Sequence, residues 1–251
     1  MKENHRKRIA VSWLLAIMML TTCIPATAFA DSTSGWNGEP AAEAPAVSES
    51  GGISWYQIED ADLAWFAKEI NDGTTGAAGS DANAQLTSDI DLSGQNWTAI
   101  GTTDNPFKGK FDGKGHSISN LSIDASSGYQ GLFGYSSGTI SNVDIKSGQV
   151  TNTASNTGSL VGINNAGGIV ENCISAAVVT DNSASTSYFG GLVGNNSGTI
   201  SKSSFTGTVQ TGNETLKQKN FGGIAGYMSN TDAVIKGCVN TGSIKAYESV
   251  E

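Results

Sequence analysis

A four-residue string that ends in glycine recurs through the second half of the chain and constrains the fold more than any other feature. Its copies are GLFG (131–134), SLVG (159–162), GLVG (191–194) and GIAG (223–226), and they start 28, 32 and 32 residues apart. A second similar string follows each copy: GTISNVDI from Gly138, GIVENCIS from Gly168, GTISKSSF from Gly198 and AVIKGCVN from Ala233. Periods of this length indicate stacked structural repeats, each of which needs its neighbours to bury its apolar side chains.

The residue types inside the repeats favour strands over helices. Glycine and β-branched residues dominate, turn residues arrive every few positions, and no 3.6-residue periodicity is sustained. Ile140, Val143 and Ile145 place apolar side chains along one edge with a kink between them. We therefore predict an all-β solenoid whose coils stack at strand spacing. Each residue of its internal apolar column should contribute about 1.5–3 kcal/mol by burial. The predicted column is Ile118, Ile140, Val170, Ile200 and Ile235.

The column includes an earlier copy, HSISNLSI from His116, which lacks the glycine pair. With this alignment Asn120, Asn142 and Asn172 fall at one equivalent position of three consecutive coils. Asn tolerates left-handed backbone, and stacked Asn side chains can hydrogen-bond along the stack. We therefore predict a turn at this position, with an Asn ladder running along it.

These repeats resemble a known family. The glycine-pair unit followed by GTI is similar to the GLUG motif of bacterial secreted and cell-surface proteins, with SLVG and GIAG departing from the pattern. The stretch LTSDIDLSGQNWTAIGT…FKGKFDGKGHSISNL (86–121) resembles the segment that commonly precedes such motifs. The resemblance covers about residues 53–245. It implies a right-handed parallel β-helix of the pectin-lyase-like type, and no defined activity.

The N-terminal region divides into an export signal and a linker. Residues 1–30 combine a basic start, an apolar stretch too short to span a bilayer comfortably, and the small residues Ala28–Ala30. They predict a signal peptide cleaved before Asp31. Residues 31–52 are rich in Pro, Ala, Ser, Gly and Glu, and predict a disordered acidic linker in which Trp36 is incidental.

The remaining chain divides into an N-terminal cap with the first coil (53–115) and the GLUG-type repeats (116–251). YQIEDADLAWFAKEIN (56–71) has helical spacing, with acidic residues near its start. We predict a short helix that caps the open end of the solenoid. Its buried face is Leu63, Phe66, Ala67 and Ile70, and Trp55, Trp65 and Trp97 are interpreted as cap core. No comparable cap is predicted at the C-terminal end. We expect either that this chain is the N-terminal part of a larger protein or that a partner covers the last coil.

The negative net charge argues against nucleic acid and anionic membranes as partners. Cleavage before Asp31 removes four of the 14 basic residues, both arginines included, and one of the 23 acidic ones, so the net charge moves from −9 to −12. Binding to nucleic acid or an anionic membrane needs clustered Lys and Arg. We therefore expect neither partner, and no membrane insertion after cleavage.

Few residues offer chemistry. Asp89 and Asp91 share one face of a predicted strand, and Asp112 lies in a glycine-rich turn, so the three are the candidate Ca²⁺ or acid–base site. We interpret them primarily as solvated carboxylates. His116 is the single histidine after residue 30, which is too few for zinc. Lys108, Lys110 and Lys114 form a small basic patch, interpreted as a solvated turn or a contact for an acidic glycan. The GKG strings there lack phosphate-loop spacing.

The sequence thus assigns no catalytic, cofactor-binding or metal-binding residue. It predicts a monomeric, non-catalytic, adhesin-like scaffold, secreted or at the cell surface, that binds a glycan or protein through its repeat face. One alternative is a glycan-cleaving β-helix that uses Asp89, Asp91 and Asp112. Another is a non-catalytic module of a larger exported enzyme, since GLUG motifs also occur in IgA-specific metallopeptidases. No His-Glu-x-x-His motif is present in this sequence.

Two cysteines follow residue 30. Cys173 and Cys238 each lie three residues after a column position, where earlier copies have Val143 and Leu121. An even count in an exported protein suggests a disulfide. However, two coil steps of about 4.8 Å place the two Cα atoms roughly 9.6 Å apart, beyond the roughly 7 Å limit for a bridge. We therefore predict two reduced, inward-facing thiols, with the register of the last coil as the weak point.

Overall fold

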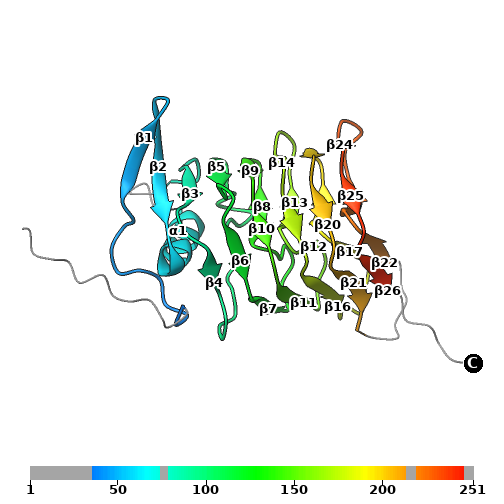
Figure 1. The fold of residues 1–251 in the computed structure, drawn as a ribbon. Coiled ribbons are helices and arrows are strands. Elements are labelled where there is room, and N and C mark those ends of the chain that lie inside the picture. Colours follow the sequence, from blue (N-terminus) through cyan, green and yellow to red (C-terminus); the bar gives the residue numbers. More distant parts are fainter. Residues whose placement is uncertain (1–35, 74–78, 213–218, 246–251) are drawn as a thin grey trace, which may run out of the picture. The chain divides into compact units, whose positions relative to one another are not determined.

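The structure is a computed structural model that describes residues 36–73, 79–212 and 219–245. In this part of the chain short strands stack into five sheets, with one helix near the N-terminal end (Figure 1). All strand pairs are parallel except the first. The chain is therefore an all-β parallel β-solenoid with an N-terminal helix, as predicted. The predicted signal peptide lies outside the described residues, among which no helix is long and apolar enough to cross a bilayer.

The sheets are named A to E here. Sheet A contains β1 (Val47–Ser50), β2 (Ile53–Ile58), β3 (Ala84–Leu86), β5 (Lys110–Asp112), β9 (Thr139–Ser141), β14 (Ile169–Glu171), β19 (Thr199–Ser201) and β24 (Val234–Lys236). Sheet B contains β4 (Ile90–Asp91), β6 (Ser117–Ser119), β10 (Asp144–Ile145), β15 (Ile174–Ser175), β20 (Ser204–Phe205) and β25 (Val239–Asn240). Sheet C contains β8 (Phe133–Ser136), β13 (Val161–Asn164), β18 (Val193–Asn196) and β23 (Ala225–Met228).

The other two sheets complete each coil. Sheet D contains β7 (Leu121–Ala125), β11 (Gly148–Asn152), β16 (Val178–Asp181), β21 (Thr208–Thr211) and β26 (Ser243–Lys245). Sheet E contains β12 (Thr157–Gly158), β17 (Ser187–Gly190) and β22 (Lys219–Gly222). A full coil visits the sheets in the order E, C, A, B and D.

The glycine-bounded strings mark the same place in every coil. Phe133, Val161, Val193 and Ala225 pair in register across sheet C, so all four predicted copies are aligned correctly. Glycine is needed there because sheets E and C approach closely. A Cβ added to Gly194 would lie 2.4 Å from the backbone nitrogen of Thr157. A fifth copy, TAIG at residues 98–101, was not predicted: its Ile100 bridges to Phe133.

The predicted internal column is correct for four of its five members. Ile140, Val170, Ile200 and Ile235 pair in register through sheet A, so the last coil does not slip. Ile118 was placed wrongly, because it pairs with Ile90 and Ile145 in sheet B. The residue that precedes Ile140 in the sheet A column is Phe111.

The error has a local cause. HSISN and GTISN both end a strand with Asn in a left-handed turn, with φ of 57° at Asn120 and 55° at Asn142. These turns lie at two different corners of the coil, after sheet B and after sheet A. Asn120 therefore does not belong to the column of Asn142 and Asn172, although the predicted kinks are present. Leu121 likewise begins β7 of sheet D and is not equivalent to Val143.

The predicted disorder of residues 31–52 is wrong over its described part, residues 36–52. Val47–Ser50 pairs antiparallel with Ile53–Tyr56 through a Gly51–Gly52 turn, and both glycines have positive φ, as a two-residue hairpin of type I′ requires. Trp36 is not incidental. It is buried, and its ring packs edge-on against Trp97 at 5.6 Å. The backbone pairing and this aromatic contact offset the low hydrophobicity on which the prediction rested.

Helix α1 (Asp60–Asp72) begins later than the predicted residue 56, because residues 56–58 belong to β2 and pair with β3. The predicted apolar face is buried. The Phe66 ring contacts the Phe107 ring at 6.0 Å, and the Asn71 side chain bonds to Ala99 and Gly101 beside sheet C. The helix therefore covers the N-terminal end of the core there, while β1 is the outermost strand of sheet A. Trp65 and Trp97 are buried as predicted, and Trp55 is half-buried.

The opposite end of the described coils is more open. Ile235 and Ile244 are 40% and 48% exposed, whereas Ile200 and Val209, which pair with them, are fully buried. No coil stacks on β24 and β26 within the described residues. The boundary predicted between residues 115 and 116 also does not separate coils, because Asp112 and Ser117 belong to successive strands of one coil.

Both cysteines are free thiols. Cys173 is buried, and burial raises the pKa of its thiol to about 12. Cys238 is half-buried in the open last coil.

We expect the folded exported protein, cleaved before Asp31, to react with a thiol reagent at Cys238 and not at Cys173, because a buried thiol with a raised pKa forms little thiolate. Unfolding without reductant should release two reactive thiols. Mass spectrometry of the labelled protein checks both numbers. A count of zero after unfolding would reveal a disulfide and contradict the register of the last coil.

Candidate functional site

An open groove of about 470 Å³ lies at the corner where the chain passes from sheet A to sheet B. Its walls include Asp112, Lys114, Asn142, Asp144, Asn172 and Ile174, which come from three successive coils. The groove forms there because β9 and β14 are followed by a single left-handed residue, Asn142 or Asn172, that turns the chain sharply. The coil of Asp112 has a longer turn, which carries Lys114 out beside the groove.

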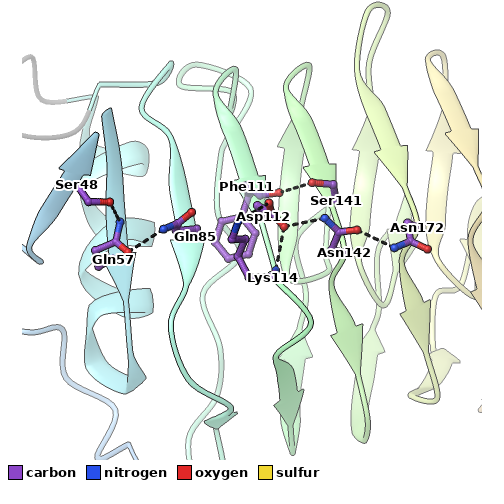
Figure 2. Close-up of polar contacts among 9 residues, drawn as sticks. All are labelled: Ser48, Gln57, Gln85, Phe111, Asp112, Lys114, Ser141, Asn142 and Asn172. Carbon is purple, nitrogen blue, oxygen red and sulfur yellow. Dashed lines mark hydrogen bonds and ion pairs between the residues drawn. The ribbon is translucent and has the colours of Figure 1, made fainter. Parts of the chain in front are cut away.

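A polar ladder runs along this groove (Figure 2). The Asn172 amide donates to the Asn142 carbonyl oxygen at 2.7 Å, and the Asn142 amide donates to a carboxylate oxygen of Asp112 at 2.8 Å. Asp112 also accepts from the backbone of Lys114, whose ammonium lies 3.9 Å from the other carboxylate oxygen. The predicted Asn ladder is thus present for Asn142 and Asn172, and Asp112 takes the place predicted for Asn120.

A second ladder continues along sheet A toward the N-terminus (Figure 2). Gln85 donates to the side chain of Gln57 at 2.8 Å, and Gln57 donates to Ser48 at 2.7 Å. The amides therefore bind neighbouring strands together, including the edge strand β1 that the sequence did not predict.

The structure does not bring Asp89, Asp91 and Asp112 together as a metal site. Among the described residues no group of three His, Cys, Asp or Glu side chains is placed to hold a metal ion. Asp89 accepts from the backbone of Ser117 and lies 3.6 Å from His116. Asp91 accepts from the Asn120 amide and from the backbone of Ser93.

These hydrogen bonds lower the pKa of both carboxyl groups. The backbone hydrogen bond from Ser117, with a smaller contribution from the charge of His116, holds the pKa of Asp89 below its ordinary value. The hydrogen bonds from Asn120 and Ser93 lower the pKa of Asp91. A carboxyl group that acts as a general acid needs the opposite, a raised pKa.

The predicted basic patch is exposed. Lys108 lies two residues before β5, Lys110 is its first residue, and Lys114 lies in the turn that follows. Lys114 is the member that reaches the groove, where it faces Asp112. The patch therefore contributes one cation to the groove, beside the carboxylates of Asp112 and Asp144.

One coil of the repeat matches a known family model. Residues 185–210 match the family described as "The GLUG motif". The chain carries a GLUG motif. The matched stretch runs from sheet E to sheet D through β17, β18, β19, β20 and β21, so one GLUG motif forms one coil of the solenoid, here named the GLUG coil.

The chain matches none of the curated proteins. A solved structure titled "Crystal structure of a putative immunoglobulin A1 protease from Bacteroides ovatus" is similar at 16% identity and a TM-score of 0.47, over 79% of this chain and 80% of that chain.

A buried ion pair beside the GLUG coil was not predicted. The ammonium of Lys219 in β22 lies 2.9 Å from a carboxylate oxygen of Asp181 in β16, and both side chains are at most 4% exposed. Ser187, at the start of the GLUG coil, donates to the same oxygen at 2.7 Å, and the backbone of Ser183 donates to the other oxygen. The pair thus joins the strands on either side of the GLUG coil. Lys219 and Asp181 are 38 residues apart in the sequence and carry no motif that would associate them.

Proposed function

We propose that this chain is an exported, non-catalytic β-solenoid that binds an extracellular ligand through the outer face of its coils. The GLUG coil and the parallel stack around it support a scaffold, because such stacks present long surfaces of repeated side chains. Secretion or display at the cell surface is part of the proposal. It rests on the sequence of residues 1–30.

One observation carries the proposal. The polar side chains of the groove already serve as hydrogen-bond partners of the next coil: Asp112 accepts from Asn142, and Asn142 accepts from Asn172. Asp91 likewise accepts from Asn120 of the following coil. Groups that hold the coils in register favour a rigid surface over acid–base chemistry.

We expect the protein to release no reducing ends and no unsaturated products from neutral or uronic-acid glycans, with or without Ca²⁺. The reason is that a hydrolase needs a paired acid and base, and a lyase needs a base opposite a bound cation. The measurement is a reducing-sugar assay together with ultraviolet absorbance. Binding without turnover in a glycan or protein screen is the expected companion result.

Alanine variants of the carboxylates provide the control. Turnover that disappears in Asp91→Ala or Asp112→Ala, while both variants keep the circular dichroism of the parent, would show an enzyme and reject the proposal. Asp144→Ala, which changes a carboxylate on the same groove, is the matched comparison.

A further inference from the structure

We propose that a face of the solenoid away from the groove binds a neutral glycan by aromatic stacking; this inference rests on the proposed function and names its ligand class. Two side-chain columns form this surface, here named the tyrosine face. The first column lies in sheet E and the turn before it, and consists of Tyr129, Asn156, Tyr188 and Asn220. The second column lies in sheet C, and consists of Tyr135, Ile163, Asn195 and Tyr227. All eight residues are half-buried or exposed.

Two aromatic pairs join the columns. Tyr129 packs edge-on against Tyr135 with ring centroids 5.9 Å apart, and Tyr188 stacks on Tyr227 at 4.6 Å with an interplanar angle of 20°. Tyr129 and Tyr227 are 36% and 43% exposed. Two to three coil steps separate the pairs, which is about 10–14 Å at strand spacing. The face therefore offers two aromatic platforms in line along the stack, with amide and aliphatic side chains between them.

Tyr129 is held in an unfavourable backbone conformation. Its φ is 67°, in the left-handed region that a bulky side chain avoids, and the equivalent residue of the next coil is Asn156 with φ of 62°. Asn tolerates this conformation well, whereas Tyr does not. A strained aromatic residue on an exposed position indicates that its side chain is needed there.

The chemistry of the face selects the ligand. None of its eight side chains is charged, although the chain has a net charge of −9. An acidic glycan would meet overall repulsion and find no cation among the eight side chains. The C–H face of a pyranose ring packs on a tyrosine ring, while its hydroxyls can bond to the tyrosine phenol groups and to the exposed Asn220 amide, since the amide oxygens of Asn156 and Asn195 are buried. A strip of eight side chains is also small compared with a stable protein interface, in which each partner buries roughly 800 Å². The size of the face therefore favours a glycan over a protein.

The test measures binding of the full chain to neutral oligosaccharides of the cello, xylo, manno and N-acetylchito series by calorimetry, with oligogalacturonate as the acidic comparison. We expect a neutral series to bind. Tyr227→Ala should weaken that binding roughly tenfold or more, since loss of one stacked aromatic ring typically lowers an affinity by about that factor. Tyr227→Phe, which keeps the ring, should retain most of the affinity.

Tyr129→Asn separates binding from folding. Because it installs the residue that the next coil carries at this strained position, we expect a thermal midpoint equal to or above that of the parent and weaker glycan binding. The inference fails, and the proposed function stands, if no neutral series binds or if both Tyr227→Ala and Tyr129→Asn bind as tightly as the parent. It fails in the same way if Tyr227→Ala instead dissociates a dimer. Turnover of a bound glycan would contradict the proposed function itself.

Discussion

Replacing Ile140 with Asp should leave the protein unfolded. The Ile140 side chain is fully buried between Phe111 and Val170 of the neighbouring coils. A carboxylate at this position would be taken out of water among aliphatic and aromatic side chains with no cation to pair with it, at a cost that exceeds the stability of most domains. Because each coil is stabilised by its neighbours, the loss should spread along the stack. Circular dichroism and urea unfolding measure the result.

A matched control lies one residue from the same column. Ile169 precedes Val170 in β14, but its side chain is 37% exposed. We expect Ile169→Asp to keep the β-sheet spectrum and to change the free energy of unfolding by less than about 1 kcal/mol. Ile140→Val, which removes one methylene, should cost about 0.5–1.5 kcal/mol. If Ile140→Asp unfolds at the same urea concentration as the parent, the assignment of this column to the core is wrong.

The repeat made most of the solenoid predictable. Glycine recurs where sheets E and C approach within contact distance, so Gly194 and its equivalents mark the register directly in the sequence. The apolar column through Ile140, Val170 and Ile200 follows from that register. The alignment failed at Ile118, where the same local conformation, a strand ending in left-handed Asn, occurs at a different corner. Local similarity reports local backbone shape, and only the pairing decides the sheet.

The N-terminal hairpin was missed for a different reason. Composition predicts disorder from low hydrophobicity, but β1 is held by backbone pairing and by the hydrogen bond from Gln57 to Ser48, neither of which needs apolar side chains. The sequence did contain one usable signal: Gly51–Gly52, between Val47–Ser50 and Ile53–Ile58, is a two-residue hairpin turn. Trp36 could not be placed, because its contact with Trp97 spans two segments with no shared pattern.

The candidate site was predictable only in part. The types of residue at the groove were identified, since Asp112, Lys114 and the Asn ladder stood out in the sequence. Their partners were not, because Asp89 and Asp91 lie beside and in β4 of sheet B and accept from the coil of β6, while Asp112 lies in sheet A and accepts from Asn142 of the coil after that. The tyrosine face has no obvious pattern in the sequence, since Asn interrupts the rings of one column and Ile and Asn together separate the rings of the other.

Lys219→Met should be the most destabilising change outside the apolar core. It removes the ammonium that lies 2.9 Å from Asp181 and leaves that carboxylate buried among the strands around the GLUG coil. Removing one partner of a buried ion pair typically costs about 3–5 kcal/mol of the free energy of unfolding, because the remaining charge is uncompensated. Chemical denaturation followed by circular dichroism gives the value.

An exposed ion pair of equal length provides the comparison. Lys202 lies 2.9 Å from Glu171, but these side chains are 71% and 41% exposed. Water screens such a pair, so Lys202→Met should cost less than about 1 kcal/mol. The two ion pairs have the same length and differ in burial and in the additional hydrogen bonds of Lys219 to Ser183, so the difference between the two losses measures burial together with those bonds.

A double variant distinguishes an uncompensated charge from lost packing. Asp181→Asn removes the charge that Lys219→Met leaves behind, while its amide oxygen can still accept from Ser187 or Ser183. Combining the two changes should therefore restore part of the stability lost in Lys219→Met alone, which is a favourable coupling in a double-mutant cycle. If the double variant is as unstable as the sum of the two single ones, the pair does not act through its charge, and Lys219 stabilises this corner by its hydrogen bonds to Ser183 and the packing of its aliphatic chain.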